Sequence, residues 1–142
     1  MEAQKAEMIA NGSLDSDQVR FHGAVLDTGR LLKAFDVLVL SSRTEGTPMV
    51  LFEAMDAGVA VVTTRVGGVP DVVREQEAIL VPSEDPEALA GGIRRVLDNP
   101  TDALQRAQRA RCRLRQEFTP ERWLDAYEDL YRTVIASSGG RD

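Results

Sequence analysis

The chain has 142 residues, of which 43% are hydrophobic and 28% are charged, and its formal net charge is −6. This length and composition predict one globular domain with a sizeable core. The negative charge argues against a general nucleic-acid partner. A single cysteine excludes an internal disulfide and fits a reducing cytosol, and a single histidine leaves no His/Cys cluster for zinc.

No apolar run in the sequence approaches the length of a membrane-spanning helix. The first residues, MEAQKAE, also lack the basic and apolar regions of a signal peptide. We therefore expect a cytoplasmic protein without a transmembrane segment. Attachment to the periphery of a membrane stays open.

The N-terminal part of the sequence predicts short elements. Residues 2–10 are typical of a short helix, and residues 19–22 of a strand that ends at Gly23. Thr28 can cap a second short helix, which leads into a strand over residues 37–40. Together these patterns favour alternating helices and strands.

Residues 41–58, SSRTEGTPMVLFEAMDAG, organise the chain. They follow the strand just described and precede a β-branched run at 59–63, which indicates a buried parallel strand. Thr47 as N-cap and Pro48 at the first helical position predict a helix, and Gly58 can end it in the left-handed conformation. Strand, loop, helix and strand form one crossover unit of a parallel sheet, whose ligands sit at the carboxyl ends of the strands.

The loop and the helix start of this unit carry groups that suit an anion and diols, the combination found in a nucleotide-diphosphate-sugar. The first helical turn offers free N–H groups at Met49, Val50 and Leu51 and the positive end of the helix dipole, which suit a phosphate. Glu45 and Glu53 flank seven residues, and carboxylates accept hydrogen bonds from diols such as ribose. Two solvated glutamates are the alternative. Because the helix looks apolar nearly all round, we expect a buried Glu53 with a partner or ligand.

Further glycine and strand signals follow. Gly67 and Gly68 let the backbone pass close to a ligand, although a plain turn is the alternative. Pro70 can open a short helix. Residues 78–81 predict a fourth strand.

The C-terminal part predicts helices. Asp85 and Pro86 favour a helix over 85–98, and a second begins near Thr101 and carries five arginines. These arginines point around most of the helix. We therefore favour a solvated face over a basic patch for phosphate or an anionic membrane.

Residues 41–58 resemble the donor-binding signature of retaining GT-B glycosyltransferases, the group 1 or family 4 set. In that signature two glutamates flank seven residues within S-x-x-E-G-x-P-x-x-x-x-E-A-M-x-x-G. The match continues over 61–73, VVTTRVGGVPDVV, and extends weakly to 19–23 and 79–82. The ordered series of segments over 19–97 makes the resemblance highly specific.

This resemblance implies an α/β fold, with a Rossmann-like parallel sheet of about four strands and flanking helices. It implies part of the second domain of a GT-B glycosyltransferase, over residues 1–136. Within it, 19–97 are the family-like part and 101–136 are C-terminal helices. We expect a flexible tail at 137–142.

The resemblance also implies a function. A nucleotide-diphosphate-sugar would donate a hexosyl group to an acceptor, without a metal or other cofactor. Glu53 is assigned to the ribose, Glu45 to the sugar with a catalytic role, and His22 and Gly23 to the neighbourhood of the base. A packing role for His22 weighs equally. The implied donor-binding residues are Glu45, Gly46, Thr47, Pro48, Met49, Val50, Glu53, His22, Gly23, Gly67 and Gly68.

Enzymes of this family have two domains, and catalysis takes place in the cleft between them. The chain resembles only the later part of the second domain, and it offers no counterpart of the acceptor domain or of the family's basic diphosphate-binding pair. We therefore expect a donor-binding half that is inactive without a first domain or a partner chain. A non-catalytic nucleotide-sugar-binding or protein-interaction module with a vestigial site is the alternative, and a sugar-nucleotide epimerase is a weaker one.

A last helix is predicted from Pro120, with Trp123, Tyr127 and Tyr131 at helical spacing. It resembles the family's C-terminal helix, which in the full enzymes packs across onto the first domain. Alternatively, the aromatic residues cover this domain's own core. Because the helix has lost its usual partner and the sheet has lost a strand, we also expect a homo-oligomer.

Overall fold

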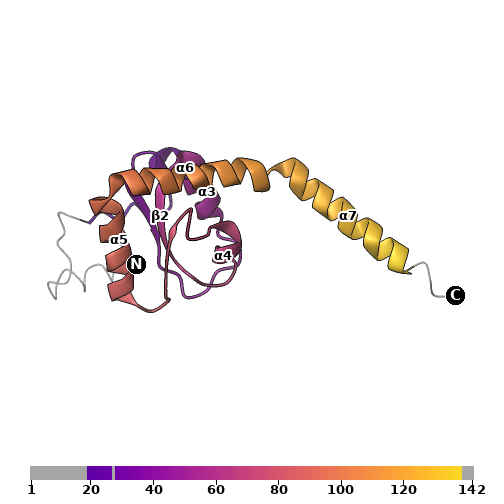
Figure 1. Ribbon diagram of the computed structural model, residues 1–142, viewed down its shortest axis with the longest axis horizontal. Coiled ribbons are helices and arrows are strands. Elements are labelled where there is room, and N and C mark those ends of the chain that lie inside the picture. Colours follow the sequence, from indigo (N-terminus) through magenta and orange to yellow (C-terminus); the bar gives the residue numbers. More distant parts are fainter. Residues whose placement is uncertain (1–18, 27, 139–142) are drawn as a thin grey trace.

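The computed structural model describes residues 19–26 and 28–138. Helices and strands alternate through most of this part of the chain, and three longer helices follow (Figure 1). In chain order the elements are α2 (Thr28–Leu32), β1 (Val37–Leu40), α3 (Met49–Ala57), β2 (Ala60–Thr64), α4 (Val69–Val72), β3 (Ile79–Val81), α5 (Pro86–Asp98), α6 (Pro100–Glu117) and α7 (Pro120–Ser138). The helix predicted at 2–10 and most of the tail predicted at 137–142 lie outside the described residues, but α7 itself extends to Ser138.

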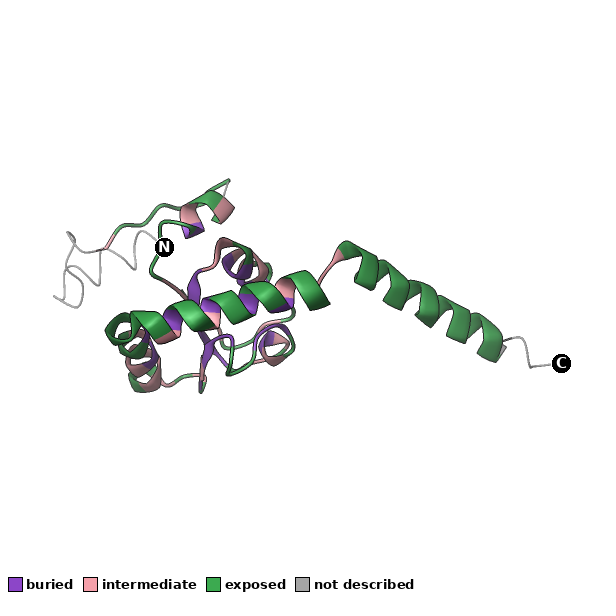
Figure 2. Cartoon of the chain, turned by 45° about the horizontal axis from the view of Figure 1, so that its top comes forward, coloured by how far each residue is buried: buried purple, intermediate pink, exposed green. Residues whose placement is uncertain are grey.

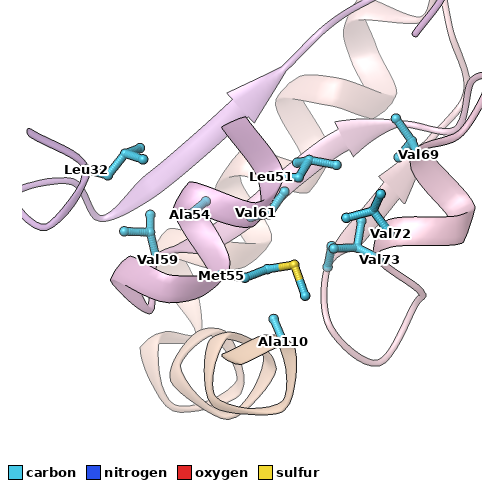
Figure 3. Close-up of a cluster of buried hydrophobic side chains, with 11 residues drawn as sticks. Leu32, Leu51, Ala54, Met55, Val59, Val61, Val69, Val72, Val73 and Ala110 are labelled. Carbon is cyan, nitrogen blue, oxygen red and sulfur yellow. The ribbon is translucent and has the colours of Figure 1, made fainter. Parts of the chain in front are cut away.

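The three strands form one parallel sheet in the order β1-β2-β3. All five residues of the central strand β2 are buried, and side chains on its two faces enter two different apolar clusters. Val61 joins Leu51 and Met55 of α3 in one cluster (Figure 3). Val62 faces the other cluster, where it meets Val96 of α5. Helices on both faces of a parallel sheet confirm the predicted α/β architecture.

The sheet is one strand smaller than predicted. Residues 19–22 form no strand within the described part of the chain, so the expectation of about four strands is wrong. Phe21 is 44% exposed and Val25 is 40% exposed. A segment that buries so little apolar surface gains too little free energy from burial to be stable as a strand.

The ends of α3 confirm one prediction and correct another. Gly58 ends the helix in the left-handed conformation, at φ 74°, as predicted. Thr47 is not the N-cap, because the buried Pro48 occupies that position in an extended conformation and the helix begins at Met49. The side chain of Pro48 has no hydrogen-bond acceptor, so it cannot cap the N–H groups of the first helical turn.

Helix α5 confirms its predicted bounds and explains one of its glycines. The Asp85 carboxylate accepts a hydrogen bond from Ala88 N at 2.9 Å, which caps the helix. A Cβ atom on Gly92 would lie 2.8 Å from Val62 Cγ1 and 3.2 Å from Ile79 Cγ2. Gly92 therefore lets α5 lie directly on the sheet. Gly91 has no such role, because a Cβ atom there would meet nothing within 4 Å.

Three arginines of α6 contact the segment between α4 and β3, so the predicted solvated face is only partly correct. Arg106 Nη1 donates to the carbonyl of Glu75, and Arg109 Nε donates to the carbonyl of Gln76 at 2.9 Å. Arg113 is 7% exposed and lies 3.9 Å from a carboxylate oxygen of Glu77, which is itself buried. These contacts hold α6 against the segment between α4 and β3.

Helix α7 extends away from the domain (Figure 1), and every residue from Pro120 to Ser137 is exposed (Figure 2). The alternative that its aromatic residues cover this domain's own core is therefore wrong. Trp123 and Tyr127 instead pack against each other, with ring centroids 4.3 Å apart and ring planes tilted by 45°. Among the described residues, no helix is both long and apolar enough to cross a bilayer.

Candidate donor site

Two loops meet at the carboxyl edge of the parallel sheet. Residues 41–48 connect β1 to α3, and residues 65–68 connect β2 to α4. The N–H of Gly68 donates to the carbonyl of Glu45 at 3.2 Å. A Cβ atom on Gly67 would lie 1.8 Å from Glu45 O, so only glycine permits this approach. The predicted glycine pair thus brings one loop against the backbone of the other.

Glu45 is half-buried, and its carboxylate has a partner within its own loop. Ser42 Oγ donates to Glu45 Oε1 at 2.6 Å. The carbonyl of Ser42 accepts a hydrogen bond from Thr64 Oγ1 at 2.6 Å, and Thr64 is the buried last residue of β2. The end of the central strand is therefore linked to the carboxylate of Glu45 through a single residue.

Glu53 is half-buried in the middle of α3, where we had expected a buried side chain. The helix buries one face, which includes Leu51 and Met55, while Met49 is 66% exposed. Glu53 therefore faces the boundary of the core, and Thr28 Oγ1 at the start of α2 donates to Glu53 Oε2 at 2.7 Å. One carboxylate oxygen of each glutamate thus has a hydroxyl partner.

The start of α3 keeps part of its predicted anion-binding character. Leu51 N donates to the carbonyl of Pro48 at 3.1 Å, so the prediction of a free N–H at Leu51 is wrong. Helix geometry leaves the N–H groups of Met49 and Val50 without intrahelical acceptors, beside the positive end of the dipole. Gly46 lies in the same loop, and a Cβ atom there would meet nothing within 4 Å.

Two cavities flank this loop. One, of about 590 Å³, lies between the start of α3 and the junction of α6 with α7, and its lining includes Thr47, Met49 and Phe118. The other, of about 390 Å³, lies at the carboxyl ends of the strands, and its lining includes Arg43 and Glu84. These two side chains form an exposed ion pair at 3.2 Å.

His22 and Gly23 lie in the segment that leads to α2, and both are exposed. Gly23 has a positive φ of 66°. Thr28, at the start of α2, donates to the carboxylate of Glu53. Among the described residues, hydrogen bonds join Glu45 to Gly68 and Ser42 but not to His22 or Gly23.

Sequence reasoning missed the hydroxyl partners of the two glutamates. Ser42 lies only three residues before Glu45, so the sequence did place these two side chains near each other. Thr28 lies 25 residues from Glu53, and no local pattern predicts that contact. Within residues 19–26 and 28–138, no group of three or more His, Cys, Asp or Glu side chains could hold a metal ion.

Known proteins resemble this chain in sequence. The family model described as glycosyl transferases group 1 matches residues 2–99. N-acetyl-alpha-D-glucosaminyl L-malate synthase of Bacillus anthracis is 31% identical over 120 residues, which are 84% of this chain and 32% of that protein. Glycogen synthase of Mycobacterium tuberculosis is 38% identical over 112 residues, which are 78% of this chain and 27% of that protein.

Solved structures also resemble the chain. Sucrose-phosphate synthase from Thermosynechococcus elongatus superposes with a TM-score of 0.82 at 30% identity, over 96% of this chain and 35% of that one. Anabaena HepE in complex with UDP-glucose superposes with a TM-score of 0.80 at 22% identity, over 94% of this chain and 36% of that one, which shows a shared fold. The chain spans about a third of the length of these proteins, or less.

Proposed function

The chain belongs to the glycosyl transferases group 1 family, and we propose that it is the donor-binding part of a retaining member of that family. Its ligand is a nucleotide-diphosphate-sugar, from which a hexosyl group passes to an acceptor. The observation that carries this proposal is the placement of two carboxylates on either side of the start of α3. Glu45 lies in the preceding loop, against Gly68, and Glu53 lies on the helix itself. Two carboxylates that can accept hydrogen bonds from diols, and a helix N-terminus that suits an anion, match the parts of such a donor.

Each part of the site has a proposed role. Glu53 accepts hydrogen bonds from the ribose hydroxyls, and Glu45 accepts them from the sugar. The N–H groups of Met49 and Val50, with the helix dipole, hold the diphosphate. HepE has been crystallised with UDP-glucose, which supports a nucleotide-sugar as the ligand class here.

The same roles describe the chemistry. In a retaining transfer, the bond between the anomeric carbon and the diphosphate oxygen breaks, and the diphosphate leaves with the electron pair. The acceptor oxygen then bonds to the same face of the sugar, and its hydroxyl proton passes to the departing diphosphate. Glu45 fixes the sugar during this exchange, and the α3 dipole stabilises the charge that develops on the diphosphate. A first domain or a partner chain holds the acceptor and supplies further cationic groups for the diphosphate.

A ligand screen tests this proposal. The purified chain is titrated with UDP, GDP and ADP, each as the free nucleotide and as its glucose conjugate, by calorimetry and thermal shift. We expect one nucleotide pair to bind and the others to bind more weakly. The matched control is Asp56→Ala, which removes an exposed charge from the last turn of α3 and should leave binding unchanged. Failure of all six ligands to bind would instead support an interaction module with a vestigial site.

A further inference from the structure

We propose that Ser42 is a positioning residue: it orients the carboxylate of Glu45 and so determines how tightly the sugar part of the donor is held. This inference rests on the proposed function, because it assumes that Glu45 contacts the sugar. Ser42 itself need not touch the ligand. Its hydroxyl acts through Glu45, to which it donates at 2.6 Å.

Ser42 is itself held in place by the sheet. Its carbonyl accepts a hydrogen bond from Thr64 Oγ1 at 2.6 Å, and Thr64 is only 3% exposed. Ser83 Oγ makes a longer contact of 3.5 Å to the same carbonyl. Because Thr64 ends the buried strand β2, this hydrogen bond ties Ser42 to the central strand of the sheet.

The backbone of Glu45 is held independently. Its carbonyl accepts a hydrogen bond from Gly68 N at 3.2 Å, and the absence of a side chain at Gly67 permits this contact. Main chain and carboxylate of Glu45 are therefore held by different neighbours. Loss of the Ser42 hydroxyl would release the carboxylate while the loop contact remains.

The chemistry of the pair explains why orientation affects binding. A serine hydroxyl has one proton to donate, and Ser42 gives it to Oε1 of Glu45. An ionised carboxylate only accepts, so Oε2 keeps its lone pairs for hydroxyl groups of a sugar. A glutamate that is already held loses less rotamer freedom when the ligand binds, which is the advantage of preorganisation.

Thr28 supplies a comparison within the same molecule. It donates to Glu53 as Ser42 donates to Glu45, but from a separate element. If Glu53 binds the ribose, loss of the Thr28 hydroxyl should weaken the nucleotide and the nucleotide-sugar equally. Loss of the Ser42 hydroxyl should weaken only the nucleotide-sugar.

The test is calorimetry on Ser42→Ala, Ser42→Thr and Thr28→Val, with the tightest-binding nucleotide among UDP, GDP and ADP and its glucose conjugate. For Ser42→Ala we expect about 3- to 10-fold weaker binding of the conjugate, the scale of one hydrogen bond, and unchanged binding of the free nucleotide. Ser42→Thr keeps the hydroxyl and should restore binding of the conjugate. A melting temperature for each variant reports whether the fold is intact.

Different results separate this inference from the proposed function. If the unmodified chain binds none of the ligands, both are wrong. If Glu45→Ala selectively weakens the conjugate but Ser42→Ala does not, the proposed function stands and the role of Ser42 is wrong. Equal weakening of both ligands by Ser42→Ala, together with a lower melting temperature, would mean that Ser42 only stabilises the loop.

Discussion

At the scale of single residues, the two glutamates are separable by experiment. Glu53→Ala should weaken the nucleotide and the nucleotide-sugar alike, by about 1–3 kcal/mol, because a charged hydrogen bond to the shared ribose is lost. Glu45→Ala should weaken only the nucleotide-sugar. Calorimetry with both ligands measures this, and Asp56→Ala is the control on the same helix. Equal losses for both ligands in both variants contradict the assigned roles.

Arg113 is the second residue with a clear expected effect. It lies 3.1 Å from Glu117 and 3.9 Å from the buried Glu77, and its Nη2 donates to the carbonyl of Asp71 at 3.1 Å. Arg113→Ala should lower the free energy of unfolding by about 3 kcal/mol, because it leaves the carboxylate of Glu77 without its buried cation. Urea denaturation measures the change.

The matched control for Arg113 is Arg115→Ala, on an exposed part of the same helix. We expect it to change the free energy of unfolding by less than about 0.5 kcal/mol. Similar small changes in both variants would show that the buried ion pair contributes nothing to stability.

At the scale of elements, the two adjacent glycines of α5 should respond in opposite directions to the same substitution. Gly91→Ala should stabilise the protein by up to about 1 kcal/mol, because alanine favours helix and the added Cβ meets open space. Gly92→Ala should destabilise it, because its Cβ would lie 2.8 Å from Val62 Cγ1 and force α5 away from the sheet. Thermal unfolding of the two variants measures the direction of each stability change. Equal effects of the two substitutions would contradict the close packing of Gly92 on the sheet.

Helix α7 supports the prediction of a homo-oligomer. Trp123, Tyr127 and Leu130 are each exposed, and with the neighbouring Leu124, Tyr131 and Val134 they form an apolar face. We expect self-association at high micromolar concentration, measured by sedimentation equilibrium. Leu130→Arg should weaken it, because it places a charge on that face. A monomer at that concentration contradicts the prediction.

The control for this experiment is Ala136→Arg. Residue 136 is exposed, and at 3.6 residues per turn it lies on the side of α7 opposite the apolar face. The substitution therefore adds the same charge away from that face. We expect this variant to associate like the unmodified chain. Equal effects of the two arginines would mean that net charge, and not the apolar face, controls association.

At the scale of the whole molecule, we expect the chain alone to transfer no sugar to an acceptor. Without an acceptor held at the anomeric carbon, the reaction forfeits about 7 kcal/mol or more of positioning, which corresponds to roughly 10⁵-fold in rate. Nucleotide release from the donor, with and without candidate acceptors, measures this. Slow hydrolysis by water agrees with the expectation, and repeated transfer to a defined acceptor without a partner contradicts it.

The sequence predicted the parts of the fold that local signals determine. Gly58 and Asp85 mark helix ends through their own chemistry, and the β-branched run before Arg65 is typical of a buried strand. Residues 19–22 also have a strand-like pattern, but a strand needs a neighbour, which a local pattern does not contain. For the same reason the sequence located both glutamates but not the contact of Thr28 with Glu53, which depends on how α2 packs against α3.

The projecting helix α7 also determines how the protein moves through solution (Figure 1). A compact domain with a 19-residue rod attached experiences more friction than a sphere of equal mass. A helix of that length is about 28 Å long, comparable to the diameter of a small domain. The monomer should therefore elute early from a gel-filtration column, at an apparent mass well above 15.6 kDa. Judged by elution volume alone, the elongated monomer could be mistaken for a dimer, whereas light scattering measures the mass directly.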